Sequence, residues 1–238
     1  MAGYKVEICG VNTAKLPLLK PEEKDAYFLR GSAELELGDY ESAKADFDQA
    51  ISMDPKNYDR LIEIYEALAA HGYREVGQEY LQNVLDTAKQ LDAYDSGRIY
   101  YYLGEYQKAY LALDEARDKG GADSYLYLGR AYAATGDYNY ASSVYNNYLS
   151  KQGPNAEIYN ELGLCEMAKK EYQNALAAFQ AGKQIEGNSL MQTLCFNEIV
   201  AYEYLEDYQQ AEVLMNAYLQ NYPDDQTAIR EQQFLSTR

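Results

Sequence analysis

The sequence contains no tryptophan, a single histidine and only three cysteines, and these shortages exclude several kinds of site. One imidazole, that of His71, cannot form the paired-histidine zinc site of a metalloprotease. Cys9, Cys165 and Cys195 include no Cys-x-x-Cys pair and leave an odd thiol, which favours a reducing compartment. Carboxylate pairs occur throughout, but none accompanies a base, a set of metal ligands or a glycine-rich phosphate loop. We therefore expect no catalytic residue, no metal and no cofactor in a protein that is not an enzyme.

Basic residues are also scarce, because 21 Lys and Arg stand against 38 Asp and Glu, which gives a net charge of −17. Nucleic acids are bound through clustered Lys and Arg, so the composition argues against a nucleic-acid partner. No stretch approaches the roughly 18 apolar residues of a membrane span, and residues 1–8 are too polar for a signal peptide. We expect a cytoplasmic protein without membrane contact. A lipoprotein outside the cytoplasm is the alternative if a signal segment was trimmed ahead of Cys9-Gly10.

The sequence does contain a repeat. Six tyrosines recur at spacings of 33, 33, 32, 34 and 36 residues, at Tyr40, Tyr73, Tyr106, Tyr138, Tyr172 and Tyr208. A small side chain follows three residues after each tyrosine, a larger apolar one follows seven after, and a glycine lies nine residues before four of them. Within each period the apolar residues fall at helical spacing, and pairs such as Gly38-Asp39 indicate a turn between two helices.

This pattern resembles the tetratricopeptide repeat, a helix–turn–helix unit of 34 residues, over about residues 24–225. The resemblance implies an all-α fold, a right-handed superhelical solenoid of about six units with a C-terminal capping helix. We expect the units at about 24–57, 58–89, 90–121, 122–155, 156–189 and 192–225, after an N-terminal segment at 1–23 and before the cap at 226–238. In the cap, Ile229 and Phe234 are expected to cover the last repeat.

In this family the first helix of each pair lines a concave groove that binds peptides or proteins. Carried over to this sequence, that register predicts a peptide-binding groove of twelve residues: Tyr94, Arg98, Tyr101, Tyr102, Tyr127, Arg130, Asn160, Glu161, Leu164, Phe196, Asn197 and Tyr204. Most of the 27 tyrosines are expected to pack where the family uses other aromatics. The remaining tyrosines would contact a ligand or a second copy of the chain in a homodimer.

Arg98 and Arg130 hold the same position in consecutive units, so both are expected to project into one stretch of the groove. Planar guanidinium groups would bind a carboxylate of a partner peptide, and Asn160 and Asn197 would bind its backbone. The alternative is that the two arginines pair with acidic residues of the chain itself, with Asp95, Glu66 or Glu161. The leading expectation is a non-catalytic scaffold or adaptor.

Residues 4–23 do not follow the repeat. The stretch KVEICGVNTAKLPLLK resembles the N-terminal signature of sporulation sigma factor G from endospore-forming bacteria. The helices that bind RNA polymerase in that family do not follow here, so the resemblance implies no sigma activity. It implies either a docking peptide that makes the chain a sporulation- or transcription-linked regulator in a bacterium, or a fusion without a role.

Overall fold

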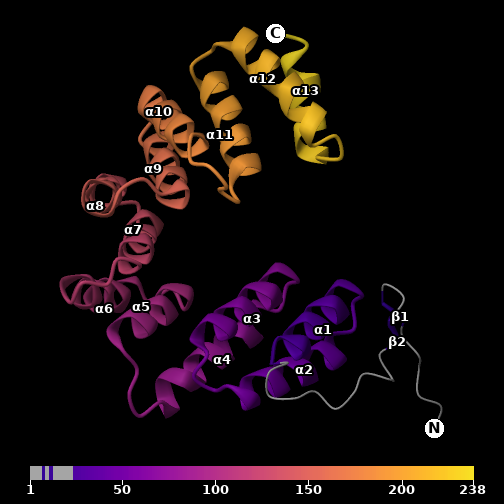
Figure 1. The fold of residues 1–238 in the computed structure, drawn as a ribbon, viewed down its shortest axis with the longest axis vertical. Coiled ribbons are helices and arrows are strands. Elements are labelled where there is room, and N and C mark those ends of the chain that lie inside the picture. Colours follow the sequence, from indigo (N-terminus) through magenta and orange to yellow (C-terminus); the bar gives the residue numbers. More distant parts are fainter. Residues whose placement is uncertain (1–6, 9–10, 13–23) are drawn as a thin grey trace. The chain divides into compact units, whose positions relative to one another are not determined.

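The computed structural model describes residues 7–8, 11–12 and 24–238, and the long segment 24–238 consists of helices joined by turns and loops (Figure 1). Two short strands, β1 (Glu7–Ile8) and β2 (Val11–Asn12), pair antiparallel. The rest of the segment that resembles sigma factor G lies outside the described residues. Within the described part of the chain, every helix is too short or too polar to cross a membrane.

The chain divides into two compact units, Met1–Leu91 and Asp92–Arg238. The first contains α1 (Lys24–Glu36), α2 (Tyr40–Met53), α3 (Tyr58–Ala70) and α4 (Arg74–Thr87). The second contains α5 (Ala93–Tyr102), α6 (Tyr106–Asp118), α7 (Ser124–Ala134), α8 (Tyr138–Gln152), α9 (Ala156–Ala168), α10 (Tyr172–Lys183), α11 (Met191–Tyr204), α12 (Tyr208–Asn221) and α13 (Gln226–Leu235). Each repeat tyrosine begins or immediately precedes the second helix of a pair, and the predicted all-α fold of helical hairpins is confirmed.

The turns inside the helical pairs share one backbone geometry. Gly38 and Gly136 have φ values of +79° and +85°, in the left-handed region that glycine tolerates without a steric penalty. The next residues, Asp39 and Asp137, cap α2 and α8, and each carboxylate accepts a hydrogen bond from the backbone N–H three residues on. Glu206 adopts the same left-handed backbone, with φ +60°, where the sixth unit has no glycine.

The glycine column and the large apolar column of the repeat are packed against each other. A Cβ atom at Gly129 would lie 2.3 Å from Cε1 of Tyr145, and one at Gly163 would lie 2.3 Å from Cε1 of Phe179. Both aromatic side chains are fully buried. The pair α3 and α4 lacks this glycine, and there Gly77 gives the close approach, to the ring of Tyr65. The columns are therefore the contact between the two helices of a pair.

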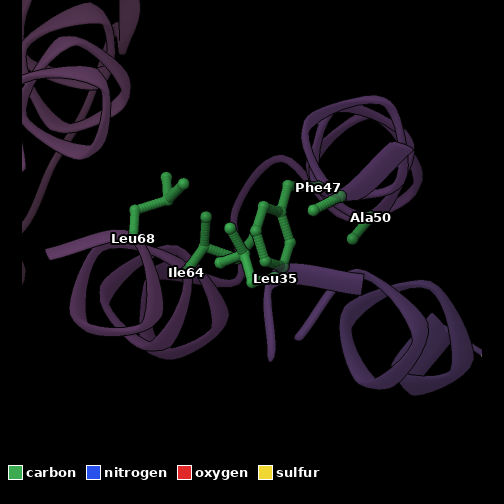
Figure 2. Close-up of a cluster of buried hydrophobic side chains, with 6 residues drawn as sticks. Leu35, Phe47, Ala50, Ile64 and Leu68 are labelled. Atoms are coloured by element: carbon green, nitrogen blue, oxygen red, sulfur yellow. The ribbon is translucent and has the colours of Figure 1, made fainter. Parts of the chain in front are cut away.

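Neighbouring hairpins share their cores. In the first unit, Leu35 of α1, Phe47 and Ala50 of α2, and Ile64 and Leu68 of α3 lie in one buried cluster (Figure 2). A single helical pair cannot bury its own apolar face, so the third helix completes the core. The second unit repeats this arrangement from α5 to α13.

The capping helix α13 buries different residues from those expected. Ala228 and Leu235 are 0% and 3% exposed in the core shared with α11 and α12, whereas Phe234 is 39% exposed and Ile229 is half-buried. Phe234 contacts the last repeat only at its edge, with its ring centroid 6.5 Å from that of Tyr208 of α12. A spacing of seven, two helical turns, places 228 and 235 on one face of the helix.

Candidate functional site

The first helices of the pairs in the second unit, α5, α7, α9 and α11, carry the twelve predicted groove residues. Side-chain contacts link these helices in order. Tyr127 of α7 meets tyrosine rings of α5, Arg130 of α7 binds carboxylates of α9, and Asn197 of α11 bonds to Asn160 of α9. These contacts connect the four helices along one side, and we call the side that carries the predicted residues the groove face.

Four tyrosines form the end of the groove face on α5 and α7. The ring centroid of Tyr127 lies 6.2 Å from that of Tyr94, 5.9 Å from that of Tyr101 and 6.0 Å from that of Tyr102, all in edge-to-face geometry. Burial raises the pKa of Tyr101 above its ordinary value. The rings are half-buried, so the cluster combines packing with an accessible aromatic surface that carries hydroxyl groups.

Arg98 is held within this cluster. Its side chain is buried, its guanidinium lies 4.4 Å from the ring centroid of Tyr94, and Nη2 donates to Oδ1 of Asp95 at 2.5 Å. Asp95 lies three residues earlier on the same helix. Arg98 thus has an acidic partner of the chain itself, one of those that the sequence offered as the alternative.

Arg130 lies between two carboxylates of α9. Its Nη2 donates to Glu157 at 2.9 Å and to Glu161 at 2.7 Å, and Nε donates to Glu161 at 3.0 Å. Burial disfavours the charged form, but these two carboxylates outweigh it and raise the pKa of Arg130. Glu161 belongs to the predicted set, whereas Glu157 was missed. It lies one helical turn before Glu161, so the helical period was the signal that would have found it.

The groove face continues along α9 and α11. Nδ2 of Asn197 donates to Oδ1 of Asn160 at 2.9 Å. This bond uses one donor of Asn197 and the acceptor oxygen of Asn160. Leu164 shares a face of α9 with Asn160 and is 43% exposed, and Tyr204 of α11 is 57% exposed and stacks on Tyr172. Both side chains therefore present apolar surface to solvent.

Three clefts open along this surface. One of about 260 Å³ lies between α5, α7 and α9 and is lined in part by Tyr94, Tyr127 and Glu157. A second of about 260 Å³ is lined in part by Phe196 and Asn197. The third, of about 510 Å³, lies between α11, the start of α12 and α13, and includes Phe196 and Tyr204. All of the predicted aromatic residues of α11 therefore border open space.

The charges of the groove face determine which ligands it can accept. Arg98 and Arg130 already bond to carboxylates of the chain, so a ligand carboxylate would have to displace Asp95 or the glutamates of α9. Removing one partner of a buried ion pair leaves an uncompensated charge, which is strongly destabilising. A ligand carboxylate on these arginines stays a prediction.

A further acidic pair, Glu203 of α11 and Glu231 of α13, lines the largest of the three clefts. Burial and the neighbouring carboxylate of Glu231 raise the pKa of Glu203 to about 7. A buried carboxylate beside a second one resists ionisation because both desolvation and like charge penalise its anion. Neither residue was among the predicted set, since the pairing depends on how α13 packs against α11.

This pair predicts a pH dependence of stability. Because the pKa of Glu203 in the folded chain exceeds its ordinary value, folding favours the protonated carboxyl. The stabilisation is complete in acid, below the ordinary pKa of glutamate, and is lost as the pH rises through about 7. The free energy of unfolding should fall between about pH 5 and pH 8, which bracket this titration, and we expect Glu203→Gln to flatten that fall. Urea denaturation at each pH measures it. The exposed Glu206→Gln is the control, and an unchanged slope in Glu203→Gln would contradict the assignment.

Sequence profiles of the tetratricopeptide repeat match residues 24–57, 94–145 and 128–188, which together span more than half of the chain. No curated protein gives a significant match. Among solved structures, the chain is similar to PilW, a widely conserved type IV pilus biogenesis factor, with a TM-score of 0.61 and 18% identity over 90% of this chain and 98% of that one. It is also similar to a thermophilic tetratricopeptide repeat protein of Thermus thermophilus, with a TM-score of 0.56 and 15% identity over 90% and 100% of the chains.

A third similar structure is YrrB, described as a tetratricopeptide repeat protein with an unusual peptide-binding site. Its TM-score is 0.52 and its identity 18%, over 79% of this chain and 97% of that one. At such identities the likeness concerns the fold. Taken together with the profile matches and the repeated helical hairpins, it shows that the chain belongs to the tetratricopeptide repeat family.

Proposed function

We propose that the chain is a protein-binding scaffold and that the groove face of its second unit binds an extended segment of a partner protein. The observation that carries the proposal is the continuity of this face, on which side chains of α5, α7, α9 and α11 contact one another in sequence. Three clefts along it would receive side chains of the partner. The peptide-binding site of YrrB, on a similar fold, supports this use.

The chemistry of the groove face supports a neutral or basic partner segment. Tyrosine rings supply rigid contact area with hydroxyl groups at their tips. The Asn197 amide lines one of the clefts and can bond to a peptide backbone, whereas Asn160 is buried and holds Asn197 through a hydrogen bond. The chain carries a net charge of −17, and the arginines of the face are neutralised by its own carboxylates. An acidic scaffold attracts basic segments at long range and so accelerates their association.

Binding of peptides selected from a random library tests this proposal. Leu164→Glu places a charge at an exposed apolar position of the groove face, and we expect it to weaken the selected peptides by about tenfold or more. Leu111→Glu makes the same change on α6, where Leu111 is 76% exposed. Its affinity should match that of the wild type in fluorescence anisotropy. Equal affinity in both variants would place the binding surface elsewhere.

The transcription-linked alternative rests on residues 4–23, and the family matches begin only at residue 24. No observation on the described residues favours it, so it stays a prediction. The expected cytoplasmic location, the expected lack of enzymatic activity and the homodimer are likewise predictions. The groove residues named from the sequence stay predictions as ligand contacts.

A further inference from the structure

The cleft of about 510 Å³ at the end of the second unit has an unusual lining. Its walls contain four aromatic rings and two carboxylates, those of Phe196, Tyr204, Tyr208, Phe234, Glu203 and Glu231. Phe196 and Tyr204 also belong to the groove face, so the cleft continues that surface. We call it the acid–aromatic cleft.

The two carboxylates have no basic partner in the cleft. Val200 and Thr227 complete its lining, so neither Lys nor Arg lines the cleft in the described structure. Oε1 of Glu203 is buried without a hydrogen-bond partner among the described residues. Burial, repulsion from Glu231 and a side-chain hydrogen bond with that carboxyl raise the pKa of Glu203 to about 7, so the pair favours a shared proton over two anions. A bound cation would take the place of that proton.

The aromatic rings of the cleft already accept a guanidinium group of this chain. The guanidinium carbon of Arg238 lies 4.5 Å from the ring centroid of Phe234 and 5.8 Å from that of Tyr208. Both distances are within the range of cation–π attraction. Arg238 is not among the lining residues, and the cleft is open with Arg238 in place. The same rings therefore suit a cation that enters the cleft itself.

We propose that the acid–aromatic cleft binds an arginine side chain of the partner segment, an inference that rests on the proposed function of the groove face. The planar guanidinium would stack on the aromatic rings and donate to Glu203 and Glu231. Arginine fits better than lysine because stacking and paired donation both need a planar, multiply donating group. The cleft would thus select partner segments that carry an arginine at the position bound at this end of the groove face.

Titration of the full chain with N-acetylarginine amide, followed by NMR at pH 8, tests this directly. We expect saturable shifts of the Phe196, Tyr204 and Phe234 ring signals, and weaker shifts with the uncharged N-acetylnorleucine amide. The double variant Glu203→Gln/Glu231→Gln should bind the arginine probe about tenfold more weakly, because both anionic acceptors become neutral. The double variant Glu206→Gln/Glu212→Gln removes the same net charge at exposed positions and should bind as the wild type does.

Equal shifts with the arginine and norleucine probes would overturn the proposal, and so would equal weakening in the two double variants. Its failure is distinguishable from that of the proposed function. Library peptides that lose affinity in Leu164→Glu would still establish the groove face as a binding surface, because Leu164 does not line the acid–aromatic cleft. Library peptides that bind Leu164→Glu normally would reject the groove face, whatever the arginine probe does.

Discussion

Leu113→Ala is expected to lower the free energy of unfolding by about 2–5 kcal/mol. Leu113 lies on α6 with a fully buried side chain, and it occupies the large apolar column of its repeat. A Cβ atom at Gly97 would lie 2.5 Å from Cγ of Leu113, so the leucine fills the space that the glycine leaves open. Truncation removes this contact and leaves a cavity between α5 and α6. Urea denaturation followed by circular dichroism measures the change.

Leu111→Ala is the matched control, since it makes the same substitution two residues earlier on the same helix. Leu111 is 76% exposed, and its loss should change the free energy of unfolding by no more than about 0.5 kcal/mol. The comparison separates burial from any change in helix propensity, which is identical for the two variants. Similar losses in both would show that the repeat columns do not make the contact between paired helices.

Lys169→Met is expected to destabilise the chain by about 3 kcal/mol, because it leaves a buried carboxylate without its cation. Glu166 of α9 is 7% exposed and accepts hydrogen bonds from Ser142 Oγ at 2.8 Å and from Lys169 Nζ at 2.6 Å. Lys169 is partly exposed, which places the expected loss at the lower end of the range for buried pairs. Urea denaturation at neutral pH provides the measurement.

Two variants control this result. Lys170→Met removes an adjacent charge that has no ion-pair partner in the described structure, and it should change stability by about 0.5 kcal/mol or less. Adding Glu166→Gln to Lys169→Met replaces the stranded carboxylate by a neutral amide and should recover part of the loss. If Glu166→Gln lowered stability as much in the Lys169→Met background as it does in the wild type, the two residues would not be coupled.

The fold could be predicted because the residues that pack between paired helices recur at a fixed spacing in the sequence. Gly129 precedes Tyr145 by the same spacing that separates Gly163 from Phe179, and both pairs are contacts between paired helices. The period of about 34 residues therefore predicted helices, turns and partners together. The cap was harder, because no second copy shows which of its residues face inward.

The helices that carry the predicted groove residues could be read from the repeat, but the charge pairing of those residues could not. The family register placed Arg130 on the surface, and the structure brings it to Glu157 and Glu161, 27 and 31 residues further along the chain. Which of 38 acidic residues reach a given arginine depends on the distance between helices, which a repeat pattern does not contain. The acid–aromatic cleft could not be predicted from the sequence for the same reason, since Glu231 meets Glu203 only through the packing of α13.

Site-specific photo-crosslinking tests the central claim, that the groove face binds a partner segment, most directly. A benzophenone amino acid would replace Leu164 on the groove face or Leu111 on α6, two exposed leucines of the second unit. A library-selected peptide would be added to each protein, and the crosslinked site on the peptide would be read by mass spectrometry. The account predicts a crosslink from position 164 and none from position 111. Crosslinking from position 111 without crosslinking from position 164 would contradict it.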